Sequence, residues 1–553
     1  MRKLIVSVFA LATLVASQVL AQAPDTVDVP SADAQGKVGA LARFILGDTT
    51  ATGERNNINR VYRLKRGEIY LLDGKVRVHF PLKLIADDDP STRPPVIAPF
   101  PLPDGSIPRI TLYLYEDSYL KNIYFLGVAP NEQRASWDRP IIIAGESTKV
   151  VLDHVITDGF RAAGIANIGE NTSLFAKDCV WRNLFVERQF GGQFFFNYGS
   201  YMDTISIVNC TVFNGSSYFL CNAREYANYV RFEHNTLFIN KINPFYVPYL
   251  SNADIKNNIF YCPASAGETP SEREGGWYDW DGEHLAVFSV DTIPSDMAAL
   301  HGITESERRI NLLNNAYFFP EKLKNYWDSI DTLYAPVWMN DRTTAMFADD
   351  EHYPYLVAEN NIEADPGFSP DIVAMVDSVL EYVKALREGG TLKAYFYNPS
   401  GQPFFPGRWP LPENLTYTNS ALLTAGTDGL PLGDLNWYPD KKAIWESMQT
   451  GVSSEKHRGL PERFALYQNY PNPFNPTTTI AFDLDRSGDV TVAIYNMLGQ
   501  KVRTLINKKM TKGHHTVRWD GRDDAGNLLA SGIYYCRLSA DKRHAVRKML
   551  LMK

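Results

Sequence analysis

The chain has 553 residues, 45% of them hydrophobic and 21% charged, a composition typical of a folded protein that excludes a largely disordered one. Its length exceeds that of one ordinary compact core, so we expect two or more domains. The formal net charge is −8, although residues 483–553 hold 14 Lys or Arg against 7 Asp, so the rest of the chain is strongly acidic. An acidic body argues against nucleic acid as the main partner.

The N-terminus has the three parts of a secretory signal peptide. Arg2 and Lys3 form a short positive stretch, residues 4–15 are apolar and uncharged, and small residues follow. We therefore expect cleavage after Ala21 or Ala23. The alternative is a membrane anchor, which is disfavoured by the polar residues near the end of the run and by the small-residue exit. No later segment of the sequence has the apolar length of a bilayer span, so we expect no transmembrane span in the mature chain.

A repeat runs through the middle of the chain. Each of seven copies has an apolar residue three positions before an anchor residue and another two positions after it. The anchors are Asn122, His154, Cys179, Cys210, Asn235, Asn258 and Asn315. Their first five spacings are 32, 25, 31, 25 and 23 residues, and the strands are aromatic and β-branched, which predicts a solenoid of stacked parallel strands. Asn suits the bend between two strands and can hydrogen-bond along a ladder.

These copies resemble the right-handed parallel β-helix proteins of the pectate-lyase-like superfamily, over residues 61–368. Residues 60–76 resemble the opening coil of such proteins and residues 359–368 the final coil. Two spacings are too long for one coil, so residues 263–309 and 320–355 should leave the solenoid as loops, where binding function usually lies. The strand cysteines Cys179, Cys210 and Cys262 are expected to be buried free thiols.

A helix and then an irregular region should follow the last coil. Ser369 can cap this helix, Pro370 suits its first turn and Gly389 ends it, and we expect it to cover the open end of the solenoid. Residues 391–449 are rich in Pro and Gly and are interpreted as irregular. Within them, the sequence GTDGLPLGDLNWYP at 426–439 is assigned no mechanism.

The end of the chain predicts a separate module. Alternating segments separated by turn signals predict a small Ig-like β-sandwich. The expected strands are residues 478–484, 490–495, 516–519, 533–538 and 545–552.

This tail resembles the C-terminal sorting domain of the type IX secretion system, of the flagellar hook-capping Ig-like kind. The resemblance rests on YPNPFNP at 470–476, IYNMLG at 494–499, WDG at 519–521 and SGIY at 531–534. It implies export through the periplasm, the outer-membrane secretion machinery as a partner, and an extracellular or outer-membrane surface location. The alternative is an ordinary Ig-like binding module.

The expected fold class is therefore all-β, a right-handed parallel β-helix followed by a small C-terminal Ig-like β-sandwich. The expected parts are a signal peptide (1–21), an N-terminal segment (22–60), the β-helix (61–368), a capping helix with an irregular region (369–449), a linker (450–463) and the sorting domain (464–553).

No motif in the part of the chain before residue 450 indicates a specific reaction. Residues 150–155, VVLDHV, resemble a short stretch of some pectate lyases, but Asp153 and His154 fall on the ladder columns, which favours a structural role. A lyase on uronates needs a base and a cation, and Arg188 and Lys241 are the candidates, with solvated loop charges as the alternative. In related enzymes the substrate lies along one sheet. The matching segments here are residues 165–168, 194–197, 218–222 and 245–248.

The loop GGWYDWDGEH at 275–284 is the densest chemical patch. Asp279, Asp281 and Glu283 could offer oxygen ligands to calcium, although the full EF-hand pattern is missing. Aromatic rings can stack on sugars, or can instead pin a loop to the solenoid by burial. The candidate substrate-binding residues are Trp277, Tyr278, Trp280 and Arg224.

Three classes of function compete. The export signals, the solenoid groove and the aromatic loop favour engagement of an extracellular polysaccharide. One alternative is a polysaccharide lyase or hydrolase acting on uronate-containing glycans. Another is a non-catalytic adhesin or a structural surface solenoid. The sequence leaves catalysis open.

Overall fold

A computed structural model describes residues 25–30, 38–184, 186–187, 191–198, 200–215, 220–221, 225–274, 285–453, 465–466, 474, 478–484, 486, 488–497, 499–510, 513–540 and 543–551. The chain divides into two compact units, Met1–Lys442 and Ala443–Lys553. The expected signal peptide lies outside the described residues, as does most of the expected linker.

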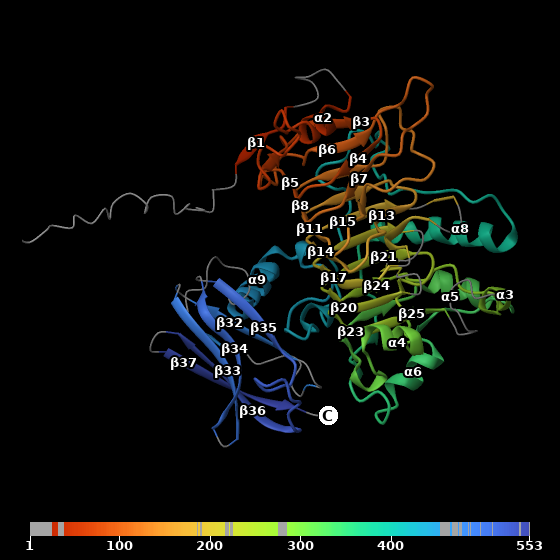
Figure 1. The fold of residues 1–553 in the computed structure, drawn as a ribbon. Helices are drawn as coiled ribbons and strands as arrows, with labels where there is room; N and C mark the ends of the chain where they lie inside the picture. The colour runs from red at the N-terminus through yellow and green to blue at the C-terminus, as the bar shows by residue number, and fades with distance from the viewer. Residues whose placement is uncertain are drawn as a thin grey trace, which may run out of the picture. The chain divides into compact units, whose positions relative to one another are not determined.

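The first unit is a parallel β-helix in which, from β2 onward, strands of the three long sheets pair with the strand three places later in the chain (Figure 1). An 11-stranded sheet holds β1 (Thr26–Asp28), β2 (Val61–Arg63), β5 (Leu82–Ile85), β8 (Ser118–Lys121), β11 (Lys149–Asp153), β14 (Thr172–Lys177), β17 (Met202–Val208), β20 (Tyr226–Glu233), β23 (Tyr249–Lys256), β26 (Arg309–Leu313) and β29 (Leu356–Glu359).

Two further sheets complete the coils. A 10-stranded sheet holds β3 (Ile69–Leu72), β6 (Val96–Pro99), β9 (Tyr124–Leu126), β12 (Ile156–Asp158), β15 (Val180–Leu184), β18 (Thr211–Gly215), β21 (Thr236–Asn240), β24 (Ile259–Tyr261), β27 (Ala316–Phe318) and β30 (Ile362–Glu363). A 7-stranded sheet holds β4 (Lys75–Val78), β7 (Thr111–Leu114), β10 (Ile141–Ile143), β13 (Ala163–Asn167), β16 (Gln193–Asn197), β19 (Leu220–Cys221) and β22 (Phe245–Tyr246). The expected β-helix is thus confirmed, and the four segments expected to share a sheet are β13, β16, β19 and β22.

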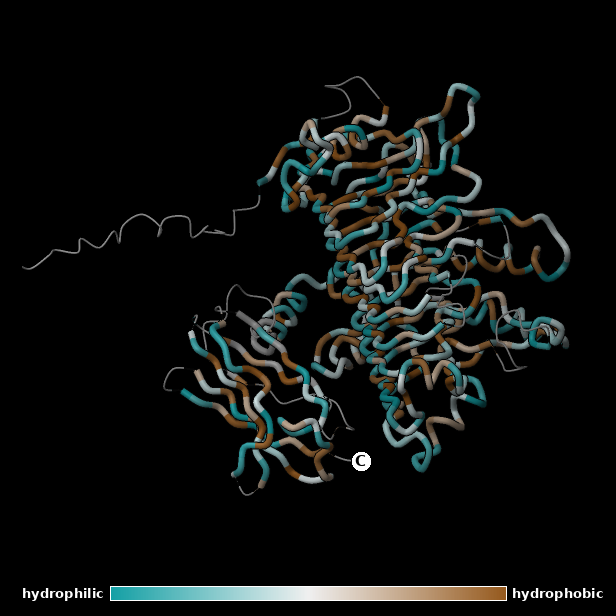
Figure 2. The backbone as a smooth tube through the Cα atoms, in the orientation of Figure 1, coloured by the Kyte–Doolittle hydropathy of each residue, from teal (hydrophilic) through white to brown (hydrophobic). Residues whose placement is uncertain are grey.

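The core lies inside the coils, where each strand turns alternate side chains inward. In β11, Val150 and Leu152 are fully buried while Lys149 is exposed. The neighbouring β14 repeats this pattern with Leu174 and Ala176. Figure 2 shows the resulting hydrophobic segments stacked through the solenoid.

A column of left-handed residues makes the sharp corner between the 11-stranded and the 10-stranded sheets. These residues have φ between 51° and 60°, a conformation that Asn, Asp and His tolerate better than most side chains. They are Asn122, His154, Asp178, Asn209, His234, Asn257, Asn314 and Asn360. Cys179 and Cys210 therefore lie one position past the corner, and the repeat alignment that placed them in one column with Asn122 and His154 is wrong by one residue.

The position after the corner points into the solenoid and carries the expected ladder. Asn235, Asn258, Asn315 and Asn361 each accept a backbone N–H from the previous coil or donate to the next ladder oxygen, at 2.8–3.2 Å. Earlier coils have Cys179 and Cys210 here, both buried free thiols as predicted, and Cys262 is buried and free as well.

The first and last coils match their expected segments, with two differences at the N-terminus. Strand β1 pairs with β2, so the solenoid begins inside the expected N-terminal segment, and α2 (Ala40–Leu46) follows it. The described parts of the two long insertions contain helices and strands. The first holds α3 (Pro270–Glu274), β25 (Ala286–Phe288), α4 (Ser295–His301) and η1 (Glu305–Glu307), and the second α5 (Glu321–Asp328), β28 (Val337–Met339) and α6 (Asp341–Phe347). β25 and β28 pair in parallel, so the third strand position continues through these coils.

The expected helix is confirmed as α7 (Pro370–Val373) and α8 (Met375–Glu388), which end at Gly389 with φ 80°. Tyr382 of α8 bonds Lys241, and Arg387 donates to the carbonyls of Ala266 and Gly267. Figure 1 shows α8 beside the solenoid, whereas the sequence analysis expected this helix to cover the open end.

The region expected to be irregular contains two 3-10 helices and one α-helix as well. They are η2 (Leu422–Thr424), η3 (Leu435–Trp437) and α9 (Pro439–Ser453). The expected boundary near residue 450 therefore falls inside a helix.

The second unit is a β-sandwich with its own core. One sheet holds β31 (Ala465–Leu466), β32 (Thr478–Leu484) and β35 (Gly513–Trp519), and the other β33 (Gly488–Asn496), β34 (Lys501–Met510), β36 (Gly532–Ala540) and β37 (Arg543–Leu551). Trp519, Ile480 and Leu538 are buried between the sheets. The five expected strands are present, whereas β34, which has no fully buried face, was missed. No helix among the described residues is long and apolar enough to cross a membrane.

Candidate functional site

A pocket of about 390 Å³ opens along the corner between the 11-stranded and 10-stranded sheets. The corner residues Asn122, His154 and Asp178 form its floor, because consecutive coils place their side chains one strand spacing apart. The remaining lining residues are Arg66, Asp88, Asp89, Pro90, Pro94, Ile156, Val180, Trp409, Leu411, Asp434, Asn436 and Trp437.

The wall opposite the floor is the stretch that was assigned no mechanism, residues 426–439. It follows the left-handed column coil by coil. Asn314 donates to the Ala425 carbonyl at 2.6 Å, Thr427 N donates to Asn257 at 2.8 Å, and Gly433 N donates to the Asn257 carbonyl at 2.8 Å. The stretch is therefore a strap held by the corner side chains, and it brings Asp434, Asn436 and Trp437 to the pocket.

Two buried carboxylates meet where the strap crosses the corner. Asp434 accepts hydrogen bonds from Thr211 at 2.6 Å and from the Asn436 amide at 2.7 Å. The Asn436 amide lies 3.3 Å from Asp178 Oδ1 as well, and Lys442 Nζ is 2.9 Å from that oxygen. Burial, with a smaller contribution from the charge of Asp178, raises the pKa of Asp434 to about 7.

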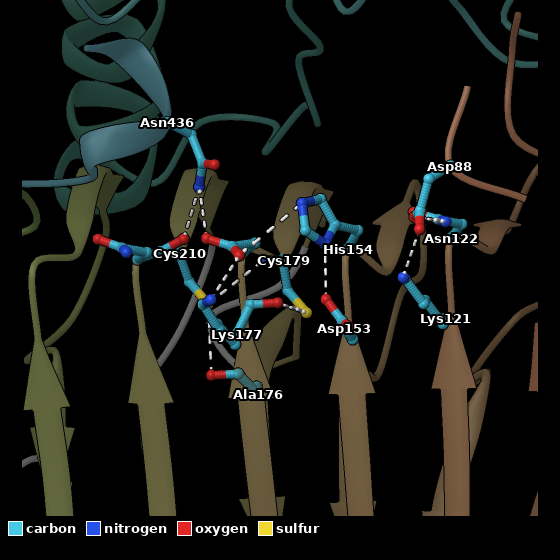
Figure 3. A network of polar contacts seen from close by, with 12 residues as sticks. Asp88, Lys121, Asn122, Asp153, His154, Ala176, Lys177, Cys179, Cys210 and Asn436 are labelled. Atoms are coloured by element: carbon cyan, nitrogen blue, oxygen red, sulfur yellow. Dashed lines mark hydrogen bonds and ion pairs between the residues drawn. The ribbon is translucent and has the colours of Figure 1, made fainter. Parts of the chain in front are cut away.

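His154 is oriented by a chain of side chains on neighbouring coils. Its Nδ1 lies 2.6 Å from Asp153 Oδ1, and the Tyr119 hydroxyl donates to Asp153 Oδ2 at 2.8 Å. Burial alone would raise the pKa of Asp153, but the bonds from His154 and Tyr119 outweigh it and hold that pKa below its usual value. Figure 3 shows His154 between Asp153 and the side chains of the next coil, with Asn436 reaching in from the strap.

Two half-buried tryptophans flank the polar floor. The indole N–H of Trp409 donates to the Pro90 carbonyl at 3.1 Å, and that of Trp437 donates to Thr211 Oγ1 at 3.1 Å. Each ring is thus fixed at one end by a hydrogen bond, and both line the pocket. Such rings offer apolar faces for stacking on a ligand.

Two clusters of described residues have the composition of a metal site. They are Asp153, His154 and Asp178, and Glu233, His234 and Asp428, each with ligand atoms within 4.8 Å of one another. In the second cluster His234 is fully buried, with Nε2 2.8 Å from Asp428 Oδ2, so this pair ties the strap to the corner. The first cluster opens to the pocket through His154, whose side chain is 47% exposed.

Most of the residues proposed from the sequence are not covered by the structure. Arg188, Arg224, Trp277, Tyr278, Asp279, Trp280, Asp281 and Glu283 lie outside the described residues. Lys241 is described, and its ammonium lies 2.8 Å from the Tyr382 hydroxyl. Burial lowers the pKa of Lys241 well below its usual range. The sequence analysis expected Lys241 to border an open groove. In the structure α8 covers Lys241 instead.

The pocket was missed although parts of it were visible in the sequence. Asp153 and His154 were noticed and assigned to the ladder. His154 does occupy the corner, but a corner side chain points outward and is free to face a ligand. The strap and Trp409 show no periodicity that would pair them with residues more than 200 positions earlier.

Comparison with known proteins finds likeness in the second unit. Residues 470–544 match the family model of the FlgD Ig-like domain. Latent PorU from Porphyromonas gingivalis is 18% identical with a TM-score of 0.14, and the match covers 17% of this chain and 10% of PorU. PorZ, described as an essential surface component of the type IX secretion system of the same organism, is 19% identical with a TM-score of 0.13, over 18% and 13% of the two chains.

FlgD from P. aeruginosa is 24% identical with a TM-score of 0.13, and the match covers 17% of this chain and 76% of FlgD. The chain therefore spans only about a tenth of the PorU and PorZ chains. No curated protein matches the chain.

Proposed function

We propose that the protein is exported by way of its C-terminal Ig-like unit and that its β-helix binds a saccharide in the corner pocket. The observation that carries the binding proposal is the pairing of Trp409 and Trp437 with a floor of carboxylate, amide and imidazole groups. Sugar rings present apolar C–H faces and a rim of hydroxyls, so they are recognised by fixed aromatic faces together with hydrogen-bonding groups.

The chemistry of the floor favours a neutral sugar over a uronate. Asp88, Asp89, Asp178 and Asp434 line the pocket against the single guanidinium of Arg66. Lys121 and Lys442 pair with Asp88 and Asp178, but they do so from outside the lining. Carboxylate oxygens accept hydrogen bonds from sugar hydroxyls, whereas they repel the carboxylate of a uronate.

The test is glycan-array binding by the purified chain, followed by titration of the best ligand. Trp409→Ala and Trp437→Ala should each weaken binding by roughly 5- to 10-fold or more, since a lost aromatic contact is worth about 1–1.5 kcal/mol. Trp338→Ala is the matched control, because Trp338 is also half-buried but stacks on Tyr317 in a separate pocket. Binding that survives both pocket variants, or that Trp338→Ala abolishes, would exclude the corner pocket as the site.

Export through the tail is tested separately. The match of residues 470–544 to the FlgD Ig-like domain and the sequence resemblance to type IX sorting domains support it. A chain that ends before residue 464 should accumulate in the periplasm, while the full chain reaches the cell surface or the medium. Unchanged surface delivery of the truncated chain would contradict the proposal without affecting the pocket.

A further inference from the structure

The corner pocket holds a buried oxygen that lacks the partners such an atom needs. The Asp178 side chain is only 1% exposed, and its Oδ2 accepts no hydrogen bond within the part of the chain that the structure describes. Lys442 Nζ pairs with the other oxygen, Oδ1, at 2.9 Å, whereas Oδ2 has Lys177 Nζ at 3.5 Å and His154 Nε2 at 3.8 Å, both beyond a good hydrogen bond. A buried anionic oxygen without a donor is costly, so this position calls for a cation.

The nitrogen that faces Asp178 Oδ2 is His154 Nε2, and it offers a lone pair rather than a proton. His154 Nδ1 lies 2.6 Å from Asp153 Oδ1, so the ring proton belongs on Nδ1 and is donated to that carboxylate. Asp153 is itself anchored by the Tyr119 hydroxyl at 2.8 Å. This carboxylate–histidine pairing is the arrangement that orients metal-binding histidines and makes Nε2 the ligand atom.

We propose that His154 Nε2 and Asp178 Oδ2 bind a divalent transition-metal ion, with zinc as the expected ion and Asp153 as the residue that positions the histidine. Zinc lies about 2.0–2.2 Å from both imidazole nitrogens and carboxylate oxygens, so one ion can contact two atoms that are 3.8 Å apart. The mixed nitrogen and oxygen ligands favour zinc over calcium, which prefers oxygen alone.

The fold holds both ligands in place and leaves the ion open on one side. His154 and Asp178 are left-handed corner residues of consecutive coils, with φ 53° and 56°, so backbone pairing of β11 with β14 fixes their spacing. Both line the pocket, so water or a ligand oxygen can occupy the remaining coordination positions. The side chains can be followed in Figure 3, in which His154 lies between Asp153 and the next coil.

Lys177 is the competitor of the ion. Its ammonium lies 3.5 Å from Asp178 Oδ2, and its side chain is 46% exposed, so it has room to move toward solvent when a metal binds. Removing this positive charge should favour the metal, because a nearby ammonium repels a divalent cation.

The proposal does not rest on saccharide binding, since zinc alone is the probe. The full chain, purified without a histidine tag and stripped with a chelator, is titrated calorimetrically with zinc and with calcium. Asp153→Asn should weaken the zinc site by roughly 10- to 100-fold, the usual cost of losing the residue that orients a histidine ligand. His154→Gln and Asp178→Asn each remove a ligand atom, so each should weaken the site more than Asp153→Asn does. Lys177→Met should tighten it. His352→Gln is the matched control, because His352 pairs with Asp349 at 2.8 Å on the exposed surface and should leave the titration unchanged.

A second readout reports the ligands directly. Cobalt substituted for zinc should give a visible absorption band that disappears in His154→Gln, whose exposed side chain makes misfolding an inadequate explanation. Zinc binding that survives His154→Gln and Asp178→Asn would overturn the proposal, because the ion would then lie elsewhere. Absence of stoichiometric zinc binding, or calcium binding that is stronger than zinc binding, would overturn it as well.

Discussion

The side chains at the left-handed corner make different contacts from one coil to the next. Asn122, His154 and Asp178 all line the pocket, and the Asn122 amide also donates to Asp88 at 2.8 Å. His234 and Asn257, further along, hold the strap. The backbone requirement for a small polar residue or a histidine at φ near +55° therefore supplies a column of polar side chains, and the protein uses a few of them for other tasks.

Arg182 carries a fully buried charge. Its guanidinium is fully buried, bonds Glu413 at 2.8 Å and bonds Asp158 at 2.5 Å, and these carboxylates outweigh the effect of burial on its pKa, which is raised. Arg182→Met would leave two buried carboxylates without a counter-charge. We expect a loss of about 3–5 kcal/mol in the free energy of unfolding of the β-helix, measured by urea denaturation.

The control for this prediction is an exposed ion pair. Lys322 and Asp377 lie 2.5 Å apart with side chains 60% and 57% exposed, so Lys322→Met should change the free energy of unfolding by no more than about 1 kcal/mol. Equal losses in the two variants would mean that the buried cluster contributes no more than a surface pair does.

Asp434 should make the stability of the β-helix depend on pH. Its folded-state pKa is raised from 3.8 to about 7, so between these values the folded chain keeps a proton that the unfolded chain has lost. The free energy of unfolding should therefore fall as the pH rises through this window, by at most about 1.4 kcal/mol per pH unit, and then level off.

Asp434→Asn tests this dependence because the amide keeps the shape of the side chain and cannot titrate. The free energy of unfolding of the variant, taken relative to that of the parent chain, should rise between pH 4 and pH 7 in denaturant titrations. Asp104→Asn provides the comparison, since Asp104 is exposed and its bonds from Ser106 lower its pKa. The difference in free energy of unfolding between Asp104→Asn and the parent chain should stay constant over the same pH window. A constant difference for Asp434→Asn would refute the pKa of about 7 for Asp434.

At the scale of elements, the strap is the part of the fold that periodicity could not predict. Strands β8 to β24 follow from the repeated apolar columns, because each coil must bury its inward side chains. The one-residue error at Asn122 and His154 arose because the corner and the ladder position both select small polar residues. The strap instead reaches the corner through single side-chain bonds such as Asn257 to Thr427, which leave no pattern in the sequence.

Gly433 is the point where the strap lies closest to the solenoid. Its φ is +81°, and a Cβ there would lie 2.5 Å from Thr236 Oγ1 and 3.1 Å from Ile259 Cδ1. Gly433→Ala should therefore cost the left-handed penalty and a steric clash, lowering the free energy of unfolding and displacing Asp434 and Trp437 from the pocket.

Gly429 separates the two contributions. It lies in the same strap with φ +75°, and a Cβ there would meet nothing within 4 Å, so Gly429→Ala should cost only about 1–2 kcal/mol. Gly433→Ala should lower the free energy of unfolding clearly more than Gly429→Ala does, as measured by chemical denaturation. It should also weaken the binding of any ligand in the pocket. Equal losses in free energy of unfolding for the two variants would show that the strap moves away from the Thr236 side chain without a steric penalty.

At the scale of the whole molecule, the two units have separate cores. The β-helix core extends from Val29 to Leu432, and the sandwich core is built around Trp519, Ile480 and Leu538. A unit with its own core can unfold without the other.

Trp519→Ala tests this independence, because Trp519 is 1% exposed between the two sheets of the sandwich. The substitution should cost the sandwich about 3–5 kcal/mol, since it leaves a large cavity in a small core. Differential scanning calorimetry of the full chain should show two transitions, of which the variant lowers one and leaves the other unchanged. The complementary variant Arg182→Met should lower only the other transition. A single transition that both variants lower would mean that the units unfold as one body, and the sandwich would then contribute to the stability of the β-helix.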